Sequence, residues 1–197
     1  MRIIRTLPLA LLIGCAALVA TPVPSGAAGP VQKCASPAPP TQSGRATITP
    51  GINGLAHTQT IVATVHLFQC TPSTATMGSG ALTITVHTPA VTCTQLNSAH
   101  TWSSTSTITW KNGSTTTVPV RLGFNTTRLI GLSGKVSAGL FVGHNVTGQL
   151  QWKPVVSPNG HTFADACANK VAPVNGGTGR VSIVGLTLVT TKPLTIT

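Results

Sequence analysis

Residues 60–68 read TIVATVHLF, and the alternation in this stretch decides the fold class. An extended chain places every second side chain on the same face. One face of this segment would then be apolar, with Ile61, Ala63, Val65 and Leu67. The opposite face would carry Thr60, Thr64 and His66. A period of two predicts a half-buried β-strand whose apolar side packs on a core.

The same alternation recurs on both sides of this segment, and almost nothing in the chain has a helical period. The predicted strands are 43–49, 60–68, 81–88, a strand ending at Trp110, 115–122, 128–137, 144–152 and 179–190. Asn112-Gly113 between two of them predicts a tight hairpin. Pro119 cannot donate a backbone hydrogen bond, which predicts an edge or a bulge there.

These segments predict an all-β fold. Eight or nine strands spaced by turns rich in Gly, Pro and Asn are typical of an antiparallel β-sandwich, either immunoglobulin-like or jelly-roll-like. Threonine, which is β-branched, suits the solvated face of such sheets. We expect residues 43–197 to form one sandwich domain, preceded at 29–42 by an extended, proline-rich lead-in.

The N-terminus has the pattern of a signal peptide, predicted to cover residues 1–28. Arg2 and Arg5 precede an apolar run, and small residues follow at 25–28. We therefore expect an extracellular, secreted protein. An alternative stays open, because Leu12-Ile13-Gly14-Cys15 resembles a lipobox in which Cys15 would carry a lipid anchor.

Four cysteines remain after the leader: Cys34, Cys70, Cys93 and Cys167. An even number in an exported chain predicts two disulfides. No Cys-x-x-Cys spacing points to zinc. Three pairings are possible, and we favour Cys34–Cys70 with Cys93–Cys167, which would fasten the N-terminal strand and a late loop.

The chain contains one acidic residue, Asp165, against twelve Lys and Arg. Paired-carboxylate glycoside hydrolysis and carboxylate-rich metal sites therefore lack their side chains. A Ser-His-Asp triad through His161 and Asp165 is formally possible, but we interpret Asp165 as a loop residue that caps backbone N–H groups or pairs with Lys170. We predict a protein that is not an enzyme, with no catalytic residue and no cofactor.

Two further groups of residues could bind ligands. His66 and His87 lie on the polar faces of neighbouring predicted strands, and a suitable register would let them share a metal ion. Two solvated strand histidines are the simpler interpretation. Trp110 and Trp152 share a face with apolar neighbours and are predicted core. Trp102 has no such neighbours, so it is the candidate for an exposed ring that stacks on a sugar.

Charge suggests the partner. Without Arg2 and Arg5 the chain keeps ten basic residues and one acid, a net charge of about +9 with neutral histidines. They are Lys33, Arg45, Lys111, Arg121, Arg128, Lys135, Lys153, Lys170, Arg180 and Lys192. Scattered cations with few aromatics do not indicate nucleic acid. We expect a binding or envelope-associated module for an anionic envelope polymer or membrane surface. The alternatives are a small-ligand carrier of the β-sandwich type and a carbohydrate-binding module.

Several short motifs resemble a family of small secreted actinobacterial proteins of uncharacterised function. They are Thr49-Pro50-Gly51-Ile52, Cys70, residues 110–114 (WKNGS), residues 134–143 (GKVSAGLFVG), Cys167 and residues 176–179 (GGTG). The position after residue 143 tends to be acidic in that family, whereas this chain has His144. The resemblance implies secretion and a β-fold, and it implies no activity.

Overall fold

The computed structural model describes residues 32–35, 43–71, 77–157, 160–168 and 181–197. The predicted leader with Cys15 lies outside the described residues. So does most of the predicted lead-in, of which only Gln32–Ala35 is described, as a short strand.

Ten strands and two short helices make up the described residues. In chain order they are β1 (Gln32–Ala35), β2 (Gly44–Ile52), β3 (Thr60–Thr71), β4 (Gly80–His87), α1 (Cys93–Leu96), β5 (His100–Trp110), β6 (Thr115–Phe124), β7 (Leu129–Lys135), β8 (Ala138–Gly139), β9 (Asn145–Val156), α2 (Phe163–Cys167) and β10 (Ile183–Ile196). Among the described residues, neither helix has the length and apolar character needed to cross a membrane.

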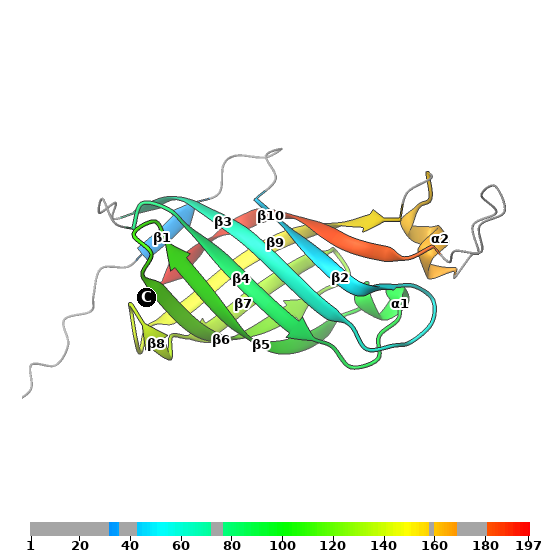
Figure 1. The fold of residues 1–197 in the computed structure, drawn as a ribbon, viewed down its shortest axis with the longest axis horizontal. Coiled ribbons are helices and arrows are strands. Elements are labelled where there is room, and N and C mark those ends of the chain that lie inside the picture. The colour runs from blue at the N-terminus through cyan, green and yellow to red at the C-terminus, as the bar shows by residue number, and fades with distance from the viewer. Residues whose placement is uncertain (1–31, 36–42, 72–76, 158–159, 169–180) are drawn as a thin grey trace, which may run out of the picture.

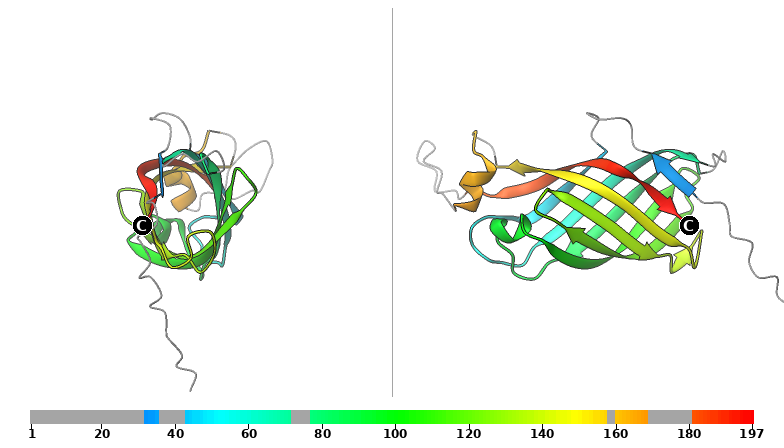
Figure 2. Two further views of the ribbon diagram at one scale, coloured as in Figure 1. Left: turned by 90° about the vertical axis from the view of Figure 1, so that its left-hand side faces the viewer. Right: turned by 180° about the vertical axis from the view of Figure 1, so that it is seen from behind.

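The all-β prediction is confirmed, but the predicted sandwich is wrong. Eight strands follow one another as antiparallel neighbours in the order β10-β2-β3-β4-β5-β6-β7-β9. β10 then also pairs along its length with β9, which closes the sheet into a barrel. Figure 1 shows the long, tilted strands of the barrel from the side, and Figure 2 shows its closed outline in end view.

Period-two alternation cannot separate these two architectures, because both have one apolar and one solvated face per strand. The difference is the pairing of β10 with β2, two segments more than 130 residues apart in the sequence. The length of the strands is a partial indication of a barrel. Several strands extend beyond the predicted ends, and β5 begins ten residues before Trp110, whereas strands of five or six residues are usual.

The core fills the inside of the barrel with side chains from all eight strands. Trp110 and Trp152 are buried in it, as predicted. The Trp110 indole Nε1 donates a hydrogen bond to Thr116 Oγ1 over 2.8 Å. The Thr116 hydroxyl donates in turn to the Leu140 carbonyl over 3.1 Å. These two hydrogen bonds satisfy the polar atoms that are buried together with the Trp110 ring.

Two strands, β1 and β2, lie one after the other between β3 and β10. β2 pairs with β3 and β10 along one half of the barrel, and β1 pairs with the same two strands further along. Ser43 stands just before β2. Its backbone N–H donates to the Leu188 carbonyl, and its carbonyl accepts from the His66 N–H, both over 2.8 Å. Its hydroxyl also accepts a hydrogen bond from the Thr190 N–H over 2.9 Å.

The favoured disulfide pairing is confirmed. Cys34 of β1 is bonded to Cys70 of β3, and Cys93 of α1 is bonded to Cys167 of α2. The first bridge fastens the short strand to the wall. The second joins the two helices at the end of the barrel opposite β1 and β8 (Figure 1). Two disulfides suit an oxidising compartment.

The hairpin predicted at Asn112-Gly113 is confirmed, whereas Pro119 lies neither on an edge strand nor at a register shift. Residues 111–114 connect β5 to β6, with Gly113 at a φ of 83° that glycine accepts without strain. Pro119 is inside β6 rather than on an edge strand. It falls between the segment paired with β7, which starts at Val120, and the segment paired with β8, which ends at Thr117. The missing N–H therefore coincides with a break in the ladder.

Glycine is required at the seam where β10 meets β2. A Cβ on Gly185 would lie 2.5 Å from the Ala46 carbonyl oxygen. On the other side of β2, where it pairs with β3, a Cβ on Gly44 would overlap the Thr64 carbonyl. Both obstacles are backbone atoms, which cannot move without opening the ladder. By contrast, a Cβ on Gly123, in the middle of the wall, would meet no atom within 4 Å.

We therefore expect Gly185→Ala to lower the free energy of unfolding by about 1–3 kcal/mol, as overpacking does. Gly123→Ala is the matched control and should be neutral or stabilising by up to about 1 kcal/mol, because the unfolded chain loses freedom. Thermal unfolding of both variants measures the difference. Equal melting temperatures would contradict the role given to the seam.

Candidate functional site

The metal site suggested for His66 and His87 does not form. His66 pairs with Ala81 across the β3–β4 ladder, whereas His87 pairs with Thr60. Six residues of extended chain therefore separate the two histidines along the ladder, about 20 Å. Both side chains are exposed on the outer face, as the alternation predicted. Within the described ranges, no three His, Cys, Asp or Glu side chains gather as a metal site would need.

Trp102 is not an exposed ring. It is only 8% exposed and points into the barrel from β5. Its ring centroid lies 4.4 Å from that of His100 and 4.6 Å from that of Phe124. His100 and Phe124 stack on each other at 4.4 Å. The sequence misled because serines occupy the inward positions that follow Trp102, and Phe124 comes from a neighbouring strand.

His100 has an altered titration in this cluster. Burial lowers its pKa below the ordinary value of 6.5, because desolvation disfavours the charged ring. The hydrogen bond between Nδ1 and the Ser98 carbonyl, 2.8 Å long, acts in the opposite direction and is the weaker effect.

Asp165 has the structural role that we predicted for it. Its carboxylate accepts hydrogen bonds from the Thr162 backbone N–H and hydroxyl, both over 2.8 Å. The Thr162 hydroxyl accepts in return from the Asp165 N–H, which completes a capping box at α2. The predicted alternative partner, Lys170, is outside the described residues.

A basic groove on the outer wall is the candidate site. It consists of two adjoining hollows that share Gly148, one of about 480 Å³ beside β1, β9 and β10 and one of about 320 Å³ across β5, β6, β7 and β9. We call this surface the basic groove. Its lining residues are Lys33, Thr101, Arg121, Gly123, Gly131, Leu132, Ser133, Thr147, Gly148, Gln149, Lys192, Pro193 and Thr195.

Register brings the polar side chains of the basic groove into line. Cross-strand partners run from Arg121 through Ser133, Thr147 and Thr195 to Lys33, one residue on each of five adjacent strands. Lys192 joins them from the next row, beside its partner Gln149. Arg121, Lys33 and Lys192 are exposed. The lining contains cations, hydroxyls and an amide but no carboxylate.

The sequence contains these cations at distant positions, and nothing in it groups them. Lys33, Arg121 and Lys192 are separated by 88 and 71 positions, and Lys33 fell in the segment predicted as a lead-in. The only signal was parity at Lys33 and Arg121, which alternate with buried neighbours, whereas Lys192 follows the exposed Thr191. Their grouping depends on β10, which pairs with β9 on one side and with β1 on the other.

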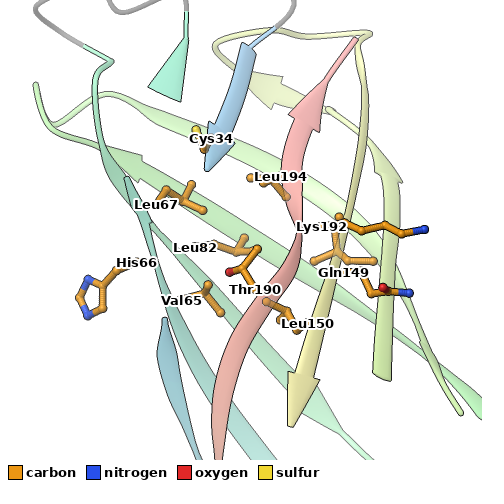
Figure 3. A pocket seen from close by; sticks show the side chains of 12 residues that line it. Cys34, Val65, His66, Leu67, Leu82, Gln149, Leu150, Thr190, Lys192 and Leu194 are labelled. Carbon is orange, nitrogen blue, oxygen red and sulfur yellow. The ribbon is translucent and has the colours of Figure 1, made fainter. Parts of the chain in front are cut away.

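The barrel interior has two small apolar cavities. One, of about 30 Å³, is lined by residues of all eight barrel strands, among them Trp102 and Phe124. The other, of about 20 Å³, lies nearer to β1 and Cys34 (Figure 3). Such cavities exceed the ~10–15 Å³ that one water requires, but an apolar lining keeps them dry.

His100 gives the core a pH dependence that can be measured. Its lowered pKa means that the unfolded chain binds a proton more readily, so stability falls as pH drops through about 6.5 and below. His100→Phe, which keeps a stacked ring, should lose less stability than the wild type between about pH 7 and pH 5. Urea unfolding across this range measures both slopes. Parallel slopes would refute the assignment.

The chain has no match among protein-family models, among curated proteins or among solved structures. The assignment of a function therefore depends on the geometry of the basic groove and of the barrel interior.

Proposed function

We propose that this protein is a secreted, non-enzymatic binding module that holds an anionic polymer of the cell envelope in the basic groove. The observation that carries the proposal is a row of cross-strand partners with an exposed cation at each end and hydroxyl side chains between them, which runs along the two adjoining hollows with Lys192 in the next row. A polymer with regularly spaced phosphates or carboxylates presents complementary charge.

The dimensions suit a chain rather than a single ion. Arg121 and Lys33 stand on strands that are four neighbours apart, β6-β7-β9-β10-β1. Strands are spaced by about 4.8 Å, so roughly 19 Å separates these two cations across the wall. An extended polymer could contact both cations and cross Ser133, Thr147 and Thr195 between them. Hydroxyl side chains can donate to its oxygens.

Unbalanced charge strengthens the attraction. Asp165 is the one acidic residue in the sequence, and α2 holds it at the end of the barrel away from β1. The groove cations therefore face no carboxylate of their own chain in the lining. Binding through such exposed charges weakens as salt rises, because ions screen them.

The sugar-stacking alternative has lost its basis. Trp102 is buried, and the lining of the basic groove includes no aromatic ring. Recognition would depend on charge and hydroxyl contacts instead. Secretion of the chain, with the lipid-anchored alternative through Cys15, is part of this proposal and is consistent with the two disulfides.

Two triple variants distinguish binding in the basic groove from an effect of net charge alone. The triple variant Lys33→Gln, Arg121→Gln, Lys192→Gln should bind immobilised poly(glycerol phosphate) roughly tenfold more weakly than the wild type, since each exposed ion pair contributes about 0.2–1 kcal/mol. Affinity should also fall as salt rises from about 50 to 500 mM. Neutral dextran serves as the reference polymer.

The matched control removes the same charges elsewhere. Arg45→Gln, Lys111→Gln, Lys153→Gln replaces one arginine and two exposed lysines outside the basic groove. We expect this variant to keep most of its affinity. Equal losses in the two triple variants would show that the net charge matters and the groove does not. Absence of binding at low salt would reject the proposal outright.

A further inference from the structure

Three exposed valines gather on the outer wall near the start of β10. Val62 and Val184 are each 40% exposed, and Val155 is 42% exposed. Register brings them together, because Val155 pairs with Gly185, the residue after Val184. The same row of cross-strand partners continues from Gly185 through Thr47 to Val62. Single exposed valines are ordinary, but three along one row form an apolar patch. We call these three side chains the valine patch.

A bulge in β10 turns Val184 outward. The register of β10 shifts between Ile183 and Gly185 against both β2 and β9. Ile183 is buried, whereas Val184 is exposed. A Cβ added to Gly51 of β2 would lie 3.4 Å from Val184 Cγ1, so the Val184 side chain lies against this glycine. Bulges redirect side chains in this way and are frequent beside functional sites.

Two cations accompany the valine patch in the next outward-facing row. Lys153, Thr187 and Arg45 are cross-strand partners on β9, β10 and β2. Lys153 stands two residues before Val155, and Arg45 stands two residues before Thr47, so roughly 7 Å separates the two rows. Both cations are exposed, and neither lines the basic groove. The apolar row and the cationic row therefore run side by side across the wall.

The valine patch is the row nearer to the end of the barrel that carries α1, α2 and the loop between β2 and β3 (Figure 1). In that loop, Leu55 is 43% exposed. Asp165 is also at this end, but its carboxylate is held by Thr162 in the capping box of α2. From the end of the barrel toward its middle, exposed apolar side chains come first and cations follow.

This order matches the depth profile of an anionic membrane surface. Apolar side chains are stable at the boundary of the acyl chains, and cations are attracted to the anionic headgroups above it. Lysine and arginine also have long apolar stems, which can lie beside valine while the charged group stays in water. A soluble anionic polymer would contact Arg45 and Lys153 but would leave the valines exposed.

We propose that the valine patch, with Arg45 and Lys153, is a docking surface for an anionic lipid membrane. The valines enter the headgroup boundary, and the two cations contact lipid phosphates. This inference goes beyond the proposed function, because it assigns a second surface on a part of the wall that is separate from the basic groove.

Lipid vesicles test the docking surface directly. In sedimentation assays at about 100 mM salt, the wild type should bind phosphatidylcholine vesicles that contain about 30% phosphatidylglycerol. Vesicles of phosphatidylcholine alone should bind at least tenfold more weakly, because they lack the anionic charge. Absence of binding to the anionic vesicles, or equal binding to both kinds, would overturn the proposal.

The valines can be exchanged without changing their shape. The triple variant Val62→Thr, Val155→Thr, Val184→Thr keeps β-branched side chains, which suit a strand, and replaces one methyl group with a hydroxyl at each position. Its affinity for anionic vesicles should fall about tenfold. The control is Val142→Thr, at a residue that is 60% exposed beside β8 at the other end of the barrel. A loss as large in the control, or no loss in the triple variant, would contradict the assignment to the valine patch.

A matched pair of charge variants gives a result even if the valine variant does not fold. Arg45→Gln with Lys153→Gln should weaken binding to anionic vesicles about fivefold for each cation removed. Lys111→Gln with Lys135→Gln removes the same charge from two exposed lysines near β8 and should have little effect. Equal losses in the two double variants would overturn the proposal, since net charge would then explain the binding.

The two surfaces can fail separately. The groove variant Lys33→Gln, Arg121→Gln, Lys192→Gln should lose affinity for poly(glycerol phosphate) and keep its affinity for vesicles. Arg45→Gln with Lys153→Gln should show the opposite pattern. Binding of vesicles without binding of the polymer would reject the proposed function and leave the docking surface in place. Loss of vesicle binding in the groove variant alone would reject the docking surface.

Discussion

The antiparallel pairing of β10 with β2 is the contact on which the rest of the structure depends. With it, a meander of strands becomes a closed wall and its apolar faces point to one shared interior. Without it, the sheet would present two long unpaired edges, which are prone to aggregation. Backbone approach at this seam is close enough to demand glycine at position 185. Ser43 extends the seam by bonding to both β3 and β10, where β2 has not yet begun.

Closure of the barrel also explains which side chains lie on its outer surface. Each strand that alternates must turn one face outward, and in this chain that face is mostly threonine and serine with isolated cations. Because the only acid caps α2, no carboxylate interrupts the wall. The pairing of β10 is irregular at two places, between Ile183 and Gly185 and again between Thr190 and Thr195, where β1 replaces β2 as its neighbour. Lys33 and Lys192 lie at this junction on the outer face of the wall.

Local features could be predicted from the sequence, and features that depend on distant pairing could not. Alternation located most of the strands, Asn112-Gly113 located a hairpin, and cysteine parity with a simple stapling argument gave the observed bridges. The sandwich prediction failed because alternation is the same in a barrel. The histidine site failed because the β3–β4 register could not be known, and a shift of pairing moves His66 away from His87. Trp102 was misplaced because its stacking partner Phe124 comes from the next strand.

The candidate site also depends on the pairing of distant strands, so it could not be predicted from the sequence. Lys33, Arg121 and Lys192 are far apart in the sequence, which favoured a diffuse positive field with no defined binding site. Register places Arg121 and Lys33 at the two ends of one row of cross-strand partners on five adjacent strands, with Lys192 in the next row. A row with a cation at each end and three hydroxyl side chains between them restricts the direction in which a chain-like ligand can lie, which net charge alone does not do. Specificity in this protein would therefore arise from the pairing of strands rather than from any local motif, since every residue of the groove is ordinary in its own sequence context.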